Sequence, residues 1–427
     1  MPGEPDPRSS GPDPVGAAAG PEQRTNPAPD PHGLDAAGRR RVTTTLCLTE
    51  LTSWGVLFYA FPVLQQQIAD DTGWAAVTVA ASFTLGQVAA ALVGIPVGRV
   101  LDRHGPRWLM TAGSVTGVAA LAVVAAAPTL AWFLLGWLLA GAAMGAVLYP
   151  PAFAALTRWH GHDARLRALT VLTVAGGLAS TVFAPLTAAL ASGLDWRTTY
   201  LVLAAVLAVV TIPLHAVGLR GRWPAAPRAR ESGASPGVKP VAGRRPRLWT
   251  TAVTFALAGL AAYAVVINLV PLLRERGASL TTAGLLLGLG GVGQVAGRLG
   301  FLSLARRSSL RSRTLTTLAA MAVTTALLGL LTGLAVLTAV VLLAGVARGM
   351  FTLLQATAVT DRWGVRHYGR LTGLLTAPTT LAIAVAPWFG AWLAETLGSY
   401  SASFLVLAAL GAIALALVPT TLRRRSW

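Results

Sequence analysis

Residues 98–107 read Gly-Arg-Val-Leu-Asp-Arg-His-Gly-Pro-Arg, a basic turn that follows an apolar run containing Gly86-Gln-Val-Ala89. About two hundred residues later Gly293-Gln-Val-Ala296 recurs in another apolar run, and the basic stretch from Arg306 to Arg313 follows it. The same block, with a basic turn at the same place in each half of the chain, predicts a duplicated bundle of membrane helices.

The composition supports this prediction. Apolar residues make up 54% of the 427 residues and charged residues only 12%, whereas soluble domains carry about 25% charged residues. Apolar runs of ~20 residues, enough to cross about 30 Å of hydrocarbon, occur twelve times. Their centres lie near residues 55, 86, 117, 145, 178, 208, 260, 291, 325, 349, 382 and 410.

The net charge of +18 is distributed unevenly along the chain. Most of the 34 lysines and arginines lie near the termini, in the central linker and in every second connection between runs. The alternate connections hold only Arg197, Arg274 and Arg276. The positive-inside rule therefore predicts a multi-pass protein of the cell membrane with both termini in the cytoplasm. Topology accounts for the basic charge, so no nucleic-acid partner is expected.

The predicted fold is an all-α membrane protein with twelve transmembrane helices in two pseudo-symmetric six-helix bundles. Residues 1–38, rich in Pro, Gly and Ala, are predicted to form a disordered cytoplasmic tail. Residues 39–219 hold the first bundle and residues 248–422 the second. Residues 220–247, rich in Pro, Gly and Arg, are the cytoplasmic linker between them, and residues 423–427 are a short cytoplasmic tail.

The sequence gives no convincing signal of catalysis or of a cofactor. Gly288-Leu-Gly-Gly-Val-Gly293 matches a dinucleotide-binding loop, but it lies inside an apolar run with no preceding strand. Glycines at helical spacing favour close helix contacts instead; the pairs are Gly284 with Gly288, Gly293 with Gly297, and Gly141 with Gly145. The six histidines have no metal-ligand spacing on a helix face. We therefore expect no enzyme activity, no metal and no cofactor.

Residues 98–107 resemble the loop between the second and third helices of the major facilitator superfamily. The residues that match its pattern are Gly98, Asp102, Arg103, Gly105 and Arg107, whereas Pro106 replaces a basic residue of the common form. In that family the Asp and Arg form a charge network with neighbouring helix ends that latches one conformation. The resemblance implies such a latch here, and Asp102 is also suited to a helix N-terminus. The alternative is a solvated turn.

Four further segments resemble monocarboxylate-transporter-like and oxalate/formate-exchanger-like members of that superfamily. They are Trp54-Gly-Val-Leu-Phe-Tyr-Ala-Phe-Pro62; Arg165-Leu-Arg-Ala-Leu169 with Ala175-Gly-Gly177; Gly297-Arg-Leu-Gly300; and Asp361-Arg-Trp-Gly364 with Tyr368-Gly369 and Gly398-Ser-Tyr400. Leu51 holds the place of the carriers' acidic residue, and Glu50 precedes it. Drug/proton antiporters place an arginine and Gly-Pro where this chain has Trp137 and Ala184-Pro185, so the resemblance to them is weaker.

Charges inside the apolar runs mark the candidate site, because a charge at the bilayer centre costs ~2.5–3.5 kcal/mol and tends to face a cavity or a partner. Arg348 lies near the middle of its run, and Thr352 and Gln355 share its helix face. Helices 1, 4, 7 and 10 line the transport cavity in the superfamily, so the resemblance puts this polar stripe in the substrate path. The alternative is a structural pair between Arg348 and a backbone group or a carboxylate.

Arg298 is separated from the basic pair at residues 306 and 307 by only seven residues, so its side chain is able to reach the membrane interface by snorkelling. The resemblance implies a different role, because the corresponding arginine of these carriers holds the substrate carboxylate. A guanidinium suits this task, since it is permanently charged and grips a carboxylate with two parallel hydrogen bonds.

Glu50 is the one carboxylate well inside an apolar run, on a face with Trp54 and Phe61. Burial disfavours the charged form of a carboxyl group, which makes Glu50 a candidate proton carrier. The alternative is a partner that neutralises an arginine. Tyr59, Tyr149 and Tyr263 are candidates to add hydroxyl groups to the cavity, or else are packing residues.

The sequence therefore predicts a secondary active transporter that moves a small organic anion by alternating access. The anion is a monocarboxylate or short dicarboxylate, and transport is coupled to protons or to anion exchange. The alternative is efflux of a hydrophobic metabolite or drug by the same fold, and a membrane enzyme or sensor is a remote alternative. The predicted partners are the small-molecule substrate and the lipid bilayer, and the protein is predicted to work as a monomer.

Overall fold

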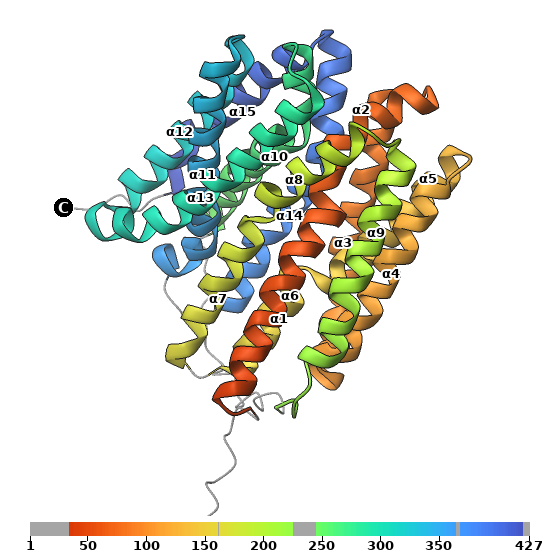
Figure 1. Ribbon diagram of the computed structural model, residues 1–427. Helices are drawn as coiled ribbons and strands as arrows, with labels where there is room; N and C mark the ends of the chain where they lie inside the picture. Colours follow the sequence, from red (N-terminus) through yellow and green to blue (C-terminus); the bar gives the residue numbers. More distant parts are fainter. Residues whose placement is uncertain (1–33, 161, 225–244, 364–367, 422–427) are drawn as a thin grey trace, which may run out of the picture.

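The computed structural model describes residues 34–160, 162–224, 245–363 and 368–421, and every regular element in them is helical (Figure 1). The elements are α1 Ala36–Trp54, the π-helix η1 Gly55–Tyr59, α2 Ala60–Thr72, α3 Ala76–His104, α4 Pro106–Ala126, α5 Leu130–Val147, α6 Tyr149–Trp159, α7 His162–Gly177, α8 Ala179–Ala191, α9 Trp196–Pro213, the π-helix η2 Leu214–Gly218, α10 Arg245–Glu275, α11 Leu280–Arg307, α12 Leu310–Leu330, α13 Leu334–Trp363, α14 Tyr368–Leu397 and α15 Tyr400–Thr421. They include twelve segments long and apolar enough to cross a membrane, as the sequence predicts.

Several spans consist of more than one element. The first span joins α1, η1 and α2, the fourth joins α5 and α6, the fifth joins α7 and α8, and the sixth joins α9 and η2. Several helices begin or end at a capping side chain or at a glycine, where the chain turns. Asp195 accepts from the Thr198 amide at 2.8 Å and begins α9, and this bond lowers the pKa of the Asp195 carboxyl group. Gly105, with φ +79°, separates α3 from α4.

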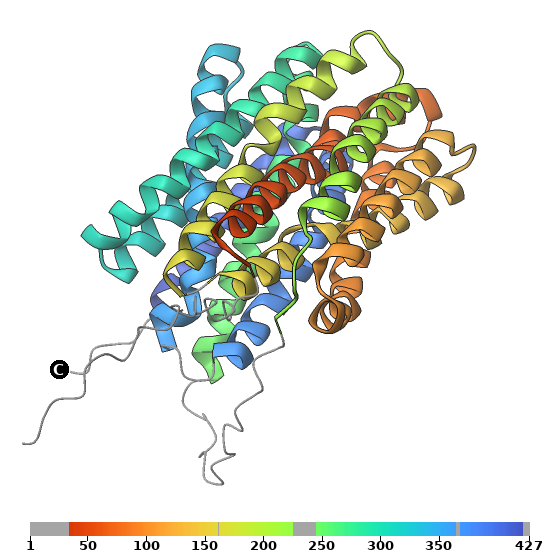
Figure 2. The same cartoon turned by 60° about the horizontal axis from the view of Figure 1, so that its bottom comes forward.

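The helices form two groups that lie side by side. In Figure 1 the elements from α1 to η2, red to yellow-green, lie beside α10–α15, green to blue, and Figure 2 shows the same elements from another side. Packing partners in the two groups correspond. The second span packs on the fourth (α3 on α5) as the eighth packs on the tenth (α11 on α13), and α4 packs on α9 as α12 packs on α15. This correspondence is the pseudo-symmetry that the repeated sequence blocks predict.

Two helix pairs carry most of the contact between the groups: α3 with α14, and α8 with α11. One further contact joins the first and seventh spans, where Gln65 Nε2 donates to the Ile267 carbonyl at 2.8 Å in a buried position. The Trp388 amide donates to Thr84 Oγ1 at 3.1 Å. We call the end of the molecule with Asp102 the basic end and the end with Thr72 the opposite end. Both hydrogen bonds lie toward the opposite end, because these residues occupy the halves of their helices nearer to it.

Glycines allow the helices to approach closely. A Cβ atom on Gly141 of α5 would lie 2.1 Å from the Gly86 carbonyl oxygen of α3, and one on Gly345 of α13 would lie 2.1 Å from the Gly290 carbonyl oxygen of α11. Gly288 likewise packs against Pro185 of α8. The apparent dinucleotide loop therefore lies in mid-helix, and its glycines serve helix contacts, as predicted.

The outer surface of the helices is apolar. Large side chains with high exposure include Val209 at 74%, Leu92 at 64% and Leu330 at 61%. Such a surface suits hydrocarbon and not water. The predicted N-terminal tail, most of the linker and the C-terminal tail fall largely outside the described residues, so the domain boundaries at 38, 219, 248 and 422 stay predictions.

Candidate functional site

A small pocket lies between the two groups of helices, and we call it the central pocket. Its volume is about 20 Å³, and it is lined by Trp54, Phe58, Tyr59, Tyr149, Gly176, Tyr263, Val266, Gln294, Arg298 and Arg348. These residues come from the first, fourth and fifth spans on one side and from the seventh, eighth and tenth on the other. Two guanidinium groups therefore face an aromatic surface, and no carboxylate lines the pocket.

The first span reaches this pocket through a π-helical turn. In a regular α-helix, neighbouring residues point about 100° apart, yet Phe58 and Tyr59 both line the pocket. They lie in η1, where the wider turn changes the helical register. Gly55 begins this turn because a side chain there would collide with Phe183, the nearest atom lying 2.1 Å from its Cβ position. Such π-helical insertions are frequent at functional sites.

Arg298 is buried, at 7% exposure, on α11. Its Nη1 donates to the Thr173 carbonyl oxygen of α7, across the boundary between the two groups. Gly177 makes room for the guanidinium, since a Cβ there would lie 2.7 Å from Nη1. The side chain therefore reaches toward α7 within the molecule and does not extend to the membrane interface.

Arg348 lies on α13 and has fewer partners. Its Nε and Nη2 atoms are buried, and neither has a hydrogen-bond partner among the described residues. The residue lines the central pocket and also a second cavity inside the group α10–α15. Burial of guanidinium N–H groups without partners is costly, so Arg348 is less well compensated than Arg298, whose Nη1 donates to Thr173.

Tyr59, Tyr149 and Tyr263, the three tyrosines that the sequence suggests as site residues, all line the central pocket. The Trp54 and Tyr149 ring centroids lie 5.1 Å apart, and those of Phe58 and Tyr263 lie 6.3 Å apart. Tyr149 stands against Gly176, where a Cβ would lie 2.3 Å from its hydroxyl oxygen. The Ala175-Gly-Gly177 segment is thus glycine-rich because α7 must admit a tyrosine and an arginine.

The predicted polar stripe of α13 does not enter one cavity. Gln355 lines a separate pocket of about 290 Å³ with Phe255, Thr379 and neighbouring residues of α14. Thr352 donates its hydroxyl to the Arg348 carbonyl oxygen at 3.1 Å. Of the three stripe residues, only Arg348 lines the central pocket.

Glu50 is fully buried on α1, and neither carboxylate oxygen has a hydrogen-bond partner among the described residues. It lies one turn before Trp54, behind the wall of the central pocket and not in it. No described ion pair involves Glu50, so the structure does not join it to Arg298 or Arg348.

Five residues of the central pocket were not predicted as site residues: Trp54, Phe58, Gly176, Val266 and Gln294. Gln294 is 6% exposed, and its Oε1 has no partner among the described residues. The repeated Gly-Gln-Val-Ala block, one turn before Arg298, was the available signal. Phe58 lines the pocket because of the π-helical turn, which no sequence pattern predicts.

The residues of the family loop gather at the basic end. Asp102 Oδ1 accepts from Arg158 Nη2 of α6 at 2.5 Å, and the Asp102 carbonyl accepts from Arg158 Nη1 at 3.1 Å. The Arg158 guanidinium lies over the Trp223 ring, 4.7 Å from its centroid. Asp102 therefore pairs with a side chain and not with a helix N-terminus.

The other loop residues have separate environments. Arg107 Nε donates to the Ala216 carbonyl of η2 at 2.7 Å. Gly105 faces Trp223, where a Cβ would lie 3.1 Å from the ring. Gly98 has open space beside it, and Arg103 is exposed. In the second group, Arg313 pairs with Asp361 at the corresponding end. Gly364 of the Asp361 segment lies outside the described residues.

The described residues contain no group of three or more His, Cys, Asp or Glu side chains able to hold a metal ion. The residues that line the central pocket provide hydrogen bonds, aromatic contacts and positive charge.

Comparison with known proteins identifies the family. The sequence profile described as the Major Facilitator Superfamily matches residues 46–341 and 315–426. Among solved structures, a bacterial homologue of the human lysosomal transporter Spinster, inward-facing and occupied, is 15% identical, with 91% of this chain and 97% of that chain covered and a TM-score of 0.72. The nucleoside transporter NupG is 14% identical, with 90% and 100% covered and a TM-score of 0.74.

No curated protein sequence matches the chain significantly. At 15% and 14% identity, the two solved structures show only that the fold is similar. The sequence profile, in contrast, extends over nearly all of the described helices. On this profile and its twelve spans, the chain is a membrane transporter and not an enzyme, and it belongs to the major facilitator superfamily.

Proposed function

We propose that the protein transports a small organic anion, a monocarboxylate or short dicarboxylate, across the cell membrane by alternating access. One observation carries the proposal: two arginines and no carboxylate line the central pocket. Positive charge without a fixed counter-charge favours an anionic ligand, because the ligand then offsets the cost of burying the guanidinium groups.

The two arginines would divide the binding. Arg298 is held by the Thr173 carbonyl and is already oriented, whereas Arg348 has unpartnered N–H groups. A carboxylate accepts two parallel hydrogen bonds from a guanidinium. We infer that Arg298 orients the substrate carboxylate, that Arg348 supplies a second charge, and that Gln294 and the tyrosines complete the polar contacts.

Alternating access follows from the way the pocket is divided. The first group of helices contributes Trp54 and Tyr149, and the second contributes both arginines. A ligand in contact with both groups favours their approach. At about 20 Å³ the pocket is smaller than a carboxylate substrate, so the groups must separate to admit one. The two hydrogen bonds between the groups lie toward the opposite end. We therefore propose that the basic end is the one that opens, and that it faces the cytoplasm.

Glu50 is the proposed proton carrier. It is buried without a hydrogen-bond partner among the described residues, and its neighbour on the helix, Trp54, lines the pocket. Protonation would remove a costly buried charge, and deprotonation would raise the demand for compensating positive charge. We propose that Trp54 and Tyr149 couple the protonation of Glu50 to the pocket. Proton symport is then the preferred mechanism, and anion exchange is the same cycle without proton coupling. The single chain supplies every residue of the site, so we propose a functional monomer.

Efflux of a hydrophobic metabolite or drug is the second candidate, favoured by the five aromatic side chains that line the pocket. Aromatic rings bind apolar and cationic ligands as readily as organic anions. The net positive charge of the pocket argues against cationic compounds.

Counterflow in proteoliposomes distinguishes the two candidates. Vesicles loaded with an unlabelled acid should take up the same labelled acid, and a panel of monocarboxylates, dicarboxylates, nucleosides and cationic dyes identifies the class. Uptake of a carboxylate that fails in the Arg298→Gln variant supports the proposal. Counterflow of neutral or cationic compounds alone, at the same rate in that variant, contradicts it.

A further inference from the structure

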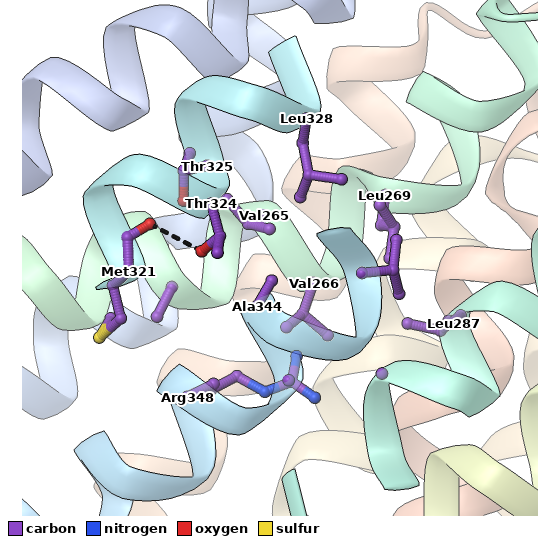
Figure 3. A pocket seen from close by; sticks show the side chains of 14 residues that line it. Val265, Val266, Leu269, Leu287, Met321, Thr324, Thr325, Leu328, Ala344 and Arg348 are labelled. Carbon is purple, nitrogen blue, oxygen red and sulfur yellow. Dashed lines mark hydrogen bonds between the residues drawn. The ribbon is translucent and has the colours of Figure 1, made fainter. Parts of the chain in front are cut away.

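A second cavity of about 40 Å³ lies inside the second group of helices and shares Val266 and Arg348 with the central pocket. It is bounded by residues of α10, α11, α12 and α13. Apart from Arg348, only Thr324 and Thr325 bring polar side chains to its wall. Figure 3 shows Arg348 extending beneath Val266 at one side, with the two threonines at the other.

No carboxylate lines this cavity, and none of the described ion pairs involves Arg348. Between residues 245 and 421 the chain contains three carboxylates, Glu275, Asp361 and Glu395. Glu275 accepts from the Tyr400 amide at 2.6 Å at the opposite end, and Asp361 pairs with Arg313 at the basic end. Glu395 lies two residues before the end of α14. None of them lines the cavity.

Water alone would compensate this charge poorly. A buried water molecule normally makes about three hydrogen bonds. Near the guanidinium the wall includes Val266 and Ala344, whose side chains accept nothing from a water O–H group. Thr324 donates to the Ala320 carbonyl at 2.7 Å, so its oxygen remains an acceptor, but it lies at the other side of the cavity. An anion needs only donors, and Arg348 Nε and Nη2 are donors without partners among the described residues.

We propose that this cavity is a binding site for a small inorganic anion, chloride in the cell, held by Arg348 inside the second group of helices. A cavity needs roughly 10–15 Å³ to hold one water molecule, so about 40 Å³ accommodates a monatomic ion and excludes organic anions. The ion is a resident counter-charge, separate from the transported substrate. It compensates Arg348 while the central pocket is empty, and the arginine remains available as the second charge when a substrate carboxylate binds.

The test is thermal unfolding of the purified full-length protein in detergent. Chloride, bromide and isethionate, a sulfonate too large for the cavity, are compared at equal ionic strength and without any carboxylate. Chloride and bromide should raise Tm by a few degrees along a saturable curve, as expected for a ligand of the native state. The Arg348→Gln variant should lose the shift, and the Arg298→Gln variant should retain it.

Two further measurements guard against a misfolded variant. Ala344→Val fills the cavity and keeps the arginine, so it should also lose the halide shift; Leu343→Val, at the neighbouring and 55% exposed position, should keep it. Crystals grown in bromide should show an anomalous peak beside Arg348. No halide shift in the parent protein, or an equal shift in Arg348→Gln, would overturn the site. Carboxylate counterflow measured in isethionate decides the transport proposal separately, whichever way the halide result falls.

Discussion

Three charged residues lie deep inside the spans, and the protein compensates them differently. Arg298 donates to a backbone carbonyl across the boundary between the helix groups, which fixes its orientation. Its Nε is buried without a partner, but Arg348 and Glu50 each have two such atoms among the described residues. Because an uncompensated charge is strongly disfavoured in the membrane, these two residues are where a ligand or a proton has the largest effect.

Replacement of Arg298 tests the carboxylate site directly. Arg298→Lys keeps the charge and loses the bidentate geometry, so we expect weaker binding with transport retained. Arg298→Gln should weaken binding roughly 10- to 100-fold, as for the loss of charged hydrogen bonds worth about 1.5–3 kcal/mol. Labelled carboxylate binding and counterflow provide the measurement. Equal affinity in the parent and in Arg298→Gln would remove the residue from the site.

Replacement of Glu50 separates exchange from proton coupling. Glu50→Gln preserves the shape of the side chain and abolishes its titration. Exchange of one bound anion for another should continue, whereas uphill accumulation driven by an inward proton gradient should disappear. Both are measured in the same proteoliposomes, with and without the gradient. Accumulation that survives in Glu50→Gln assigns the proton to another group.

At the scale of helices, the sequence predicts what composition and spacing dictate and misses what depends on local geometry. The twelve spans follow from apolar runs, and the close contacts of α3 with α5 and of α11 with α13 follow from glycine spacing. The π-helix at Gly55–Tyr59 has no such pattern, so Phe58 was not predicted in the pocket. Helical spacing gives Gln355 and Arg348 a shared face of α13, so both were predicted at one site. Spacing alone does not show where one cavity ends and another begins.

The glycine contacts have a stability consequence. Gly141→Ala places a Cβ atom 2.1 Å from the Gly86 carbonyl oxygen, so α3 and α5 must separate, at an expected cost of about 1–3 kcal/mol for overpacking. Gly94→Ala, also on α3, meets nothing within 4 Å and should be neutral or slightly stabilising, because alanine favours helices. Thermal unfolding of the two variants measures the difference, and equal Tm values would contradict the close contact.

At the scale of the whole molecule, each end has its own interactions. Near the opposite end the two helix groups share the Gln65–Ile267 and Thr84–Trp388 hydrogen bonds. The described ion pairs of the basic end, Arg158 with Asp102 and Arg313 with Asp361, each lie within one group. Such an arrangement lets the groups separate at the basic end without breaking a described ion pair.

The orientation in the membrane is tested by cysteine labelling. With Cys47 replaced, single cysteines in residues 220–247 should react with an impermeant reagent only after the cells are opened. Cysteines at positions 70 and 195 should react in intact cells, because these residues lie at the opposite end. The reverse pattern would invert the proposed topology and place the basic end outside.

The Asp102–Arg158 pair is expected to set the conformational equilibrium and not substrate affinity. Asp102 lies near the end of α3, the helix that packs against α14 of the second group, so loss of its bonds to Arg158 alters the position of an interface helix. Asp102→Asn should therefore slow turnover several-fold while the dissociation constant of the substrate changes by less than a few-fold. Asp70→Asn is the matched control, since its exposed carboxylate accepts from Gln66 of the same helix at 2.9 Å, and its turnover should stay at the parental value. Rates of counterflow and equilibrium binding on the same preparations separate the two effects. A large loss of affinity in a folded Asp102→Asn variant would instead place the loop in the substrate path.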